Sequence, residues 1–175
     1  MRSIIIFILF ISALHTVNGQ TPIEVGTKYP VNSEVLGEER SVWIGLPDNY
    51  DSTISYPVVY VLDAEWQFDI TQATVKELAA NDKVPAHIVV GIPHVDRKRR
   101  FKDMTFTTTA RGSDGETDST LLNFFGEEQT GGGASFYGHL VTEVIPFVEG
   151  RHKTLGFDVF IGHSLSGYYG AYLIS

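Results

Sequence analysis

Ser164 is the residue whose surroundings in this sequence best fit covalent chemistry. It lies in Gly162-His-Ser-Leu-Ser-Gly167, after an apolar run at residues 159–161 and before a stretch suited to a helix. This order is typical of a nucleophile elbow, in which a strained turn displays a serine hydroxyl at a helix N-terminus. Small residues on either side let strand and helix approach closely. The alternative is a glycine-rich structural turn.

The segments around this turn alternate between strand-like and helix-like patterns. Apolar runs predict strands, and a spacing of three or four residues between apolar positions predicts helices. The expected strands cover residues 23–31, 41–46, 56–62, 86–92 and 159–161, and the expected helices cover 70–80 and 136–148, with a kink at Pro146. The last strand, like those at 56–62 and 86–92, is expected to be buried. This order predicts an α/β fold with a mostly parallel sheet, right-handed crossovers and helices on both faces.

A long polar segment, residues 93–134, interrupts this alternation and is expected to be functional or mobile. It contains Gly131-Gly-Gly133, which lacks the Lys-Ser/Thr that completes a phosphate-binding loop. We therefore interpret the glycines as a hinge or a helix start. The basic cluster Arg97–Arg100 is interpreted as part of a solvated loop.

Several motifs together resemble the esterase D-like branch of the α/β-hydrolases, the Putative esterase family, which includes siderophore and carbohydrate esterases. The motifs are Ser33–Arg40, Leu46–Tyr50, Tyr56–Asp63, Val90–Ile92, Arg100–Asp103, Gly131–Gly133, Glu143–Pro146 and Gly162–Gly167. The resemblance covers most of residues 31–175. It implies an α/β-hydrolase fold that is truncated after the helix of the elbow, and it implies no metal or organic cofactor.

The resemblance also implies roles for individual residues. Ser164 is similar to the acylated nucleophile, and the backbone N–H of Leu165 to one oxyanion donor. The second donor is expected at Glu65 or, as the weaker choice, at Ala64, where the family has a glycine. Two arginines and one aspartate are expected to flank the pocket and contact substrate. These three residues are Arg99, Arg100 and Asp103.

The base that would activate the serine is not evident in the sequence. In this fold the acid and then the histidine of the triad follow the nucleophile, yet no Asp, Glu or His follows Ser164. The upstream histidines are interpreted as ordinary surface or core residues: His87, His94, His139, His152 and His163. We therefore expect the chain to be the N-terminal part of a longer enzyme, and to fold poorly and hydrolyse little by itself.

The N-terminus is typical of a secretory signal peptide. Arg2 precedes an apolar run from Ile4 to Leu14, which is shorter than the ~20 residues that span a membrane, and a cleavage site is expected before Gln20. Residues 20–175 then form one domain, exported to the periplasm or the exterior. The chain has no cysteine, and its formal net charge of −8 argues against nucleic acid or an anionic membrane as partner of the mature form.

The function expected from these observations is a secreted serine carboxylic-ester hydrolase that acts on a small-molecule ester through an acyl-enzyme on Ser164. An acyltransferase would use the same residues. Two alternatives without catalysis are a secreted binding domain that keeps the scaffold and a purely structural α/β domain. Siderophore, carbohydrate and small acyl esters are all candidate substrates, and no residue chooses among them.

Overall fold

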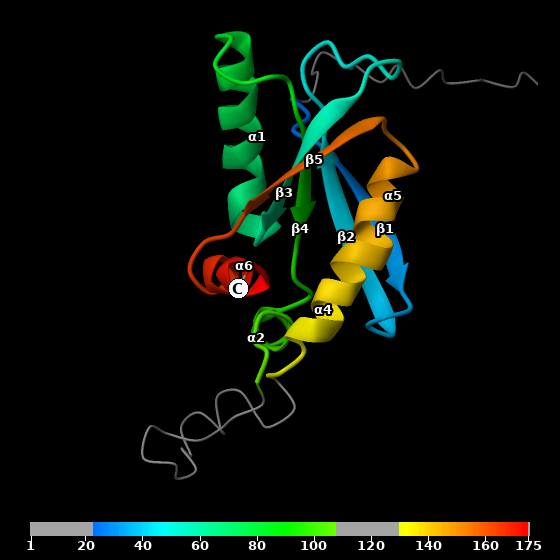
Figure 1. The fold of residues 1–175 in the computed structure, drawn as a ribbon, viewed down its shortest axis with the longest axis vertical. Coiled ribbons are helices and arrows are strands. Elements are labelled where there is room, and N and C mark those ends of the chain that lie inside the picture. Colours follow the sequence, from blue (N-terminus) through cyan, green and yellow to red (C-terminus); the bar gives the residue numbers. More distant parts are fainter. Residues whose placement is uncertain (1–22, 108–129, 175) are drawn as a thin grey trace, which may run out of the picture.

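The protein is built around a five-stranded sheet with helices on both faces (Figure 1). The computed structural model describes residues 23–107 and 130–174. The expected signal peptide and most of the polar segment at 93–134 lie outside the described residues. Among the helices of the described part, none has the length and apolar character needed to cross a membrane.

The strands lie in the order β1-β2-β4-β3-β5. Their bounds are β1 Thr27–Ser33, β2 Glu38–Gly45, β3 Tyr56–Leu62, β4 Ile88–Ile92 and β5 Thr154–Ile161. β1 pairs antiparallel with β2, and β2 antiparallel with β4, whereas β4, β3 and β5 are parallel. The prediction of a mostly parallel sheet was therefore wrong, because the sheet is mixed. For β1 and β2 the reason is local: a short turn with Gly37 at φ 68° joins them, and such a turn can connect only antiparallel neighbours.

Two helical layers cover the sheet. The helices are α1 Ala64–Ala80, α2 Arg97–Asp103, α4 Gly133–His139, η2 Leu140–Val144, α5 Ile145–Glu149 and α6 Leu165–Leu173. On one face Phe68 of α1 packs with Val59, Val61 and Val89. The larger core lies on the other face and joins the sheet to α4, η2, α5 and α6. α1 begins shortly after β3 and α6 shortly after β5, so the ends of these strands determine where the two helices begin.

The expected helix at 136–148 is present with a change of pitch. η2 is a π-helical turn that ends at Val144, two residues before Pro146 in α5. Proline has no N–H, and its ring conflicts with the carbonyl four residues earlier. The wider turn accommodates this conflict without breaking the helix.

β5 differs from its prediction as a buried strand. Within the predicted run 159–161, Phe160 is 40% exposed, whereas Val159 and Ile161 are partly buried and pack against the smaller core. The reason is topological: within the described residues β5 pairs only with β3 and is an edge strand of the sheet. An apolar run predicts a strand but not its place in the sheet.

Glu143 joins this helical layer to the β1–β2 turn. Its carboxylate accepts hydrogen bonds from the Ser33 hydroxyl, from the N–H groups of Glu34 and Val35 at 2.7 and 3.0 Å, and lies 2.6 Å from His139 Nδ1. Burial opposes ionisation, but these bonds outweigh it and lower the pKa of Glu143 to about 2. The turn is thus held by a charged acceptor.

Replacing Glu143 with glutamine is expected to lower the free energy of unfolding at neutral pH by about 2 kcal/mol. Because the folded pKa is depressed, the carboxylate stabilises the fold above about 4.5 and loses its effect as the pH falls towards about 2. Chemical denaturation across this range should show a shallower acid dependence in E143Q. The control is Glu149→Gln, at an exposed position of α5. Equal acid dependence in E143Q and the unmodified protein would contradict this assignment.

Candidate active site

Ser164 lies on the turn between β5 and α6 in a strained conformation. Its φ of 59° and ψ of −119° belong to a region that non-glycine residues seldom occupy. The residue is exposed and directly precedes the first turn of α6. A Cβ at Gly162 would lie 2.5 Å from the Ser166 carbonyl oxygen, so only glycine allows this approach of strand and helix. The backbone therefore has the form expected of a nucleophile elbow.

Ser166 takes the place of the second glycine in the elbow motif, and it is fully buried. Its Oγ accepts a hydrogen bond from the His163 N–H at 2.7 Å and lies 2.7 Å from Asp63 Oδ2. The side chain thus links the elbow to the end of β3.

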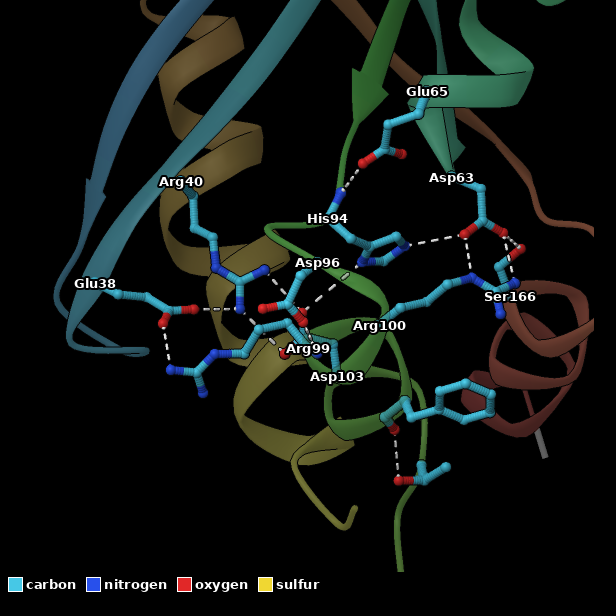
Figure 2. Close-up of polar contacts among 12 residues, drawn as sticks. Glu38, Arg40, Asp63, Glu65, His94, Asp96, Arg99, Arg100, Asp103 and Ser166 are labelled. Atoms are coloured by element: carbon cyan, nitrogen blue, oxygen red, sulfur yellow. Dashed lines mark hydrogen bonds and ion pairs between the residues drawn. The ribbon is translucent and has the colours of Figure 1, made fainter. Parts of the chain in front are cut away.

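Asp63 is the centre of the polar contacts at this edge of the sheet (Figure 2). It follows β3 in the left-handed conformation, with φ 55° and ψ 44°. Its carbonyl oxygen accepts the N–H groups of Trp66 and Gln67 at 2.9 and 3.0 Å, which begins α1. The helix starts six residues before the predicted Ile70, because the polar residues after β3 belong to its first turn.

Three side chains surround the buried Asp63 carboxylate. Arg100 donates from Nε to Oδ1 and from an NH2 group to Oδ2 at 2.9 Å. His94 Nε2 lies 3.0 Å from Oδ1, and the Ser166 hydroxyl completes the set. Burial opposes ionisation, but hydrogen bonds from Arg100, His94 and Ser166 outweigh it and hold the pKa of Asp63 well below its ordinary value. The carboxylate is therefore charged at neutral pH.

His94 lies between two carboxylates. Besides its contact with Asp63, its Nδ1 is 3.9 Å from Asp103 Oδ2. Burial lowers the pKa of His94, but the neighbouring carboxylates Asp103 and Asp63 outweigh this and raise it. Asp96, two residues after His94, caps α2 by accepting the Arg99 N–H at 2.8 Å. The prediction of His94 as an ordinary surface or core residue was wrong, because its ring lies between Asp63 and Asp103 in this network.

The predicted substrate-contact residues differ in accessibility. Asp103 is 3% exposed, and its carboxylate forms a two-point pair with Arg40 at 2.7 and 3.1 Å. Arg99 pairs with Glu38 at 2.7 Å and keeps 39% of its side chain exposed. Arg100 lies under the ring of the exposed Trp66. We propose that Asp103 holds Arg40 and the β4–α2 loop in place, and that direct substrate contact falls to the arginines.

The proposed oxyanion donors are at two helix N-termini. Leu165 is the first residue of α6 and Glu65 the second of α1, where backbone N–H groups have no partner within the helix. Glu65 Oε1 accepts the His94 N–H at 2.6 Å and ties α1 to the loop after β4. Ala64 is buried where the family has glycine, and Gly91 makes room for it, since a Cβ there would lie 2.9 Å from the Ala64 methyl.

The other described histidines make local contacts. His152 Nδ1 lies 2.9 Å from the Tyr50 hydroxyl, and His139 lies beside Glu143. His87 contacts the Pro85 carbonyl. Within residues 23–107 and 130–174, no histidine hydrogen-bonds the Ser164 hydroxyl, and no group of three or more His, Cys, Asp or Glu side chains is placed to hold a metal ion.

Comparison with known proteins decides the family. Residues 33–174 match the sequence profile of the family described as Putative esterase. The chain belongs to this family. The match confirms the resemblance drawn from the separate motifs, which cover the same part of the chain. The comparison with curated proteins gives no match.

Solved structures with the same fold include three bacterial proteins. An IroE-like serine hydrolase from Shewanella oneidensis is 31% identical with a TM-score of 0.71, covering 82% of this chain and 44% of that one. The BES protein from Bacillus cereus is 23% identical with a TM-score of 0.71, covering 89% and 59%. The enterobactin esterase FES from Shigella flexneri is 20% identical with a TM-score of 0.62, covering 87% and 33%. This chain therefore spans less than two thirds of the length of each of these three structures.

Proposed function

We propose that this member of the esterase family is an exported serine hydrolase of small-molecule carboxylic esters, with Ser164 as the nucleophile. The observation that carries the proposal is the backbone of Ser164, held at φ 59° in an exposed turn at the start of α6. A strained, exposed serine at a helix N-terminus has a use in acyl transfer and none in packing. The apolar leader at residues 1–19 supports export.

The proposed reaction begins with attack of the Ser164 hydroxyl oxygen on the ester carbonyl carbon. The carbonyl oxygen gains negative charge, which the N–H groups of Leu165 and Glu65 stabilise. A general base takes the serine proton, and we assign this role to none of the described histidines. The C–O bond to the alcohol then breaks as the base returns the serine proton to the leaving oxygen, which leaves an acyl-enzyme, and water releases the acid. Arg99 and Arg100 are proposed to contact the substrate.

A panel of esters tests this function in the full-length protein. We expect hydrolysis of p-nitrophenyl acetate and of at least one of two larger substrates, an acetylated sugar or a catecholate siderophore lactone. In dilute added alcohol the free acid should remain the main product, whereas an acyltransferase would give mainly the new ester. A folded protein that hydrolyses none of these esters, yet binds one of them, would contradict the proposal and favour the non-catalytic binding domain.

A further inference from the structure

Ser166 makes a contact that the usual glycine of the elbow motif cannot make. Its hydroxyl carries one proton and has two acceptors in reach, Asp63 Oδ2 at 2.7 Å and the His163 carbonyl at 2.9 Å. A charged acceptor forms the stronger bond, so the proton is directed to Asp63. The His163 N–H donates a hydrogen bond to the hydroxyl oxygen. The side chain is thereby fixed in one orientation.

This hydrogen bond connects the two segments of the chain that carry the proposed oxyanion donors. Ser166 directly follows Leu165, and Asp63 lies two residues before Glu65 and begins α1 with its own carbonyl oxygen. Residues 63 and 166 are far apart in the sequence, yet one buried hydrogen bond connects them. Figure 2 shows Ser166 at the start of the elbow helix facing Asp63 at the end of β3. The contact is therefore placed to set the distance between the two N–H groups.

The Asp63 carboxylate is held in place by other side chains besides Ser166. Arg100 binds both of its carboxylate oxygens, and His94 binds one of them. Asp63 itself is held in the left-handed conformation at the end of a fully buried strand. A change at residue 166 would therefore move the elbow rather than Asp63.

We propose that Ser166 is a positioning residue that sets the spacing of the Leu165 and Glu65 N–H donors through its hydrogen bond to Asp63. The inference rests on the proposed function, because the donors have a role only if Ser164 is acylated. Oxyanion donors act at about 2.7–3.1 Å from the developing charge. A small displacement of these N–H groups therefore reduces the stabilisation of the transition state more than it reduces the binding of the substrate.

The test compares variants of the full-length protein with an ester substrate and a fluorophosphonate. Ser166→Ala removes the hydroxyl and is expected to lower kcat about tenfold with KM nearly unchanged, and to slow fluorophosphonate labelling by a similar factor. Ser166→Gly also removes the hydroxyl and places the usual residue of the motif in the turn, so it replaces the alanine variant as the test if that variant folds poorly. We expect the same loss of kcat in both variants. An equal loss would show that the missing hydroxyl, and not the change in side-chain volume, is responsible.

Tyr169→Phe is the matched control. The Tyr169 hydroxyl is also buried on α6, but it donates to the Gly133 carbonyl at 3.0 Å, away from Asp63. We expect this variant to keep its kcat and its labelling rate, even where its thermal midpoint falls as far as that of the Ser166 variants. A purely structural role of Ser166 would instead give equal kinetic losses in all three variants and would overturn the inference.

The outcome for Ser166 can be separated from the outcome for the proposed function. If Ser164→Ala abolishes turnover while both Ser166 variants keep the kcat and labelling rate of the unmodified protein, the positioning role is wrong and the nucleophile stands. If Ser164→Ala leaves turnover intact, Ser164 is not the nucleophile and the proposed function is wrong, whatever the Ser166 variants show. A kcat loss in Ser166→Ala that becomes smaller when Asp63 is already asparagine would support the inference, because asparagine removes the charge that makes residue 63 the stronger acceptor of the Ser166 hydroxyl.

Discussion

Replacing Ser164 with alanine in the full-length protein is expected to reduce kcat/KM for ester hydrolysis by about 10⁴-fold or more. The nucleophile forms the covalent bond of the acyl-enzyme, so its loss leaves only binding and the oxyanion donors. Steady-state kinetics with p-nitrophenyl acetate measures this directly. The variant should fold, since alanine makes no demand that serine does not already meet at φ 59°.

The matched control is Ser135→Ala, which removes an exposed serine from α4. It is expected to keep full activity. Ser164→Gly provides a second check, because glycine relieves the left-handed strain and should raise the free energy of unfolding by about 1 kcal/mol while abolishing turnover. Activity in Ser164→Ala comparable to that of Ser135→Ala would exclude Ser164 as the nucleophile.

Asp63→Asn is expected to have the largest effect on stability, lowering the free energy of unfolding at neutral pH by about 3 kcal/mol. Asparagine tolerates the left-handed conformation at this position, so the loss reports the missing charge. Arg100 and the buried His94 would each lose an ionised partner. Urea denaturation at constant ionic strength gives the difference.

The pH dependence of this variant follows from the same contacts. The pKa of Asp63 is depressed in the fold, so its contribution is present above its ordinary value of 3.8 and is lost as the pH falls below it. The pKa of His94 is raised, so its contribution is present below 6.5 and is lost as the pH rises through the folded value. Both dependences should weaken in Asp63→Asn. Asp69→Asn, on the exposed side of α1, is the control, and an equal effect of both changes would contradict the role of Asp63.

The elbow could be predicted from the sequence because its requirements are local. Gly162, Ser164 and a small residue at 166 lie within one turn. Their spacing indicates that strand and helix approach closely at this turn, and the structure shows this approach. The strand at 56–62 was predicted with its exact bounds for a related reason, since an unbroken apolar run is typical of a strand covered on both faces.

The polar network could not be predicted in the same way. Arg40, Asp63, His94 and Asp103 come from four separate segments, and their meeting depends on the strand order β2-β4-β3. One signal was available: Asp63 and His94 each follow the end of a predicted buried strand, and parallel strands end at a common edge of a sheet. The exposure of β5 and the antiparallel β2–β4 pair also depend on topology, which periodicity does not contain.

Covalent labelling shows directly whether Ser164 is an activated nucleophile. The full-length protein would be treated with a fluorophosphonate, digested, and the modified peptide sequenced by mass spectrometry. We expect one adduct, on Ser164, that forms rapidly in the native protein and is absent after denaturation. No adduct on the folded protein, or an adduct on another serine with Ser164 unmodified, would contradict the role of Ser164 as the nucleophile.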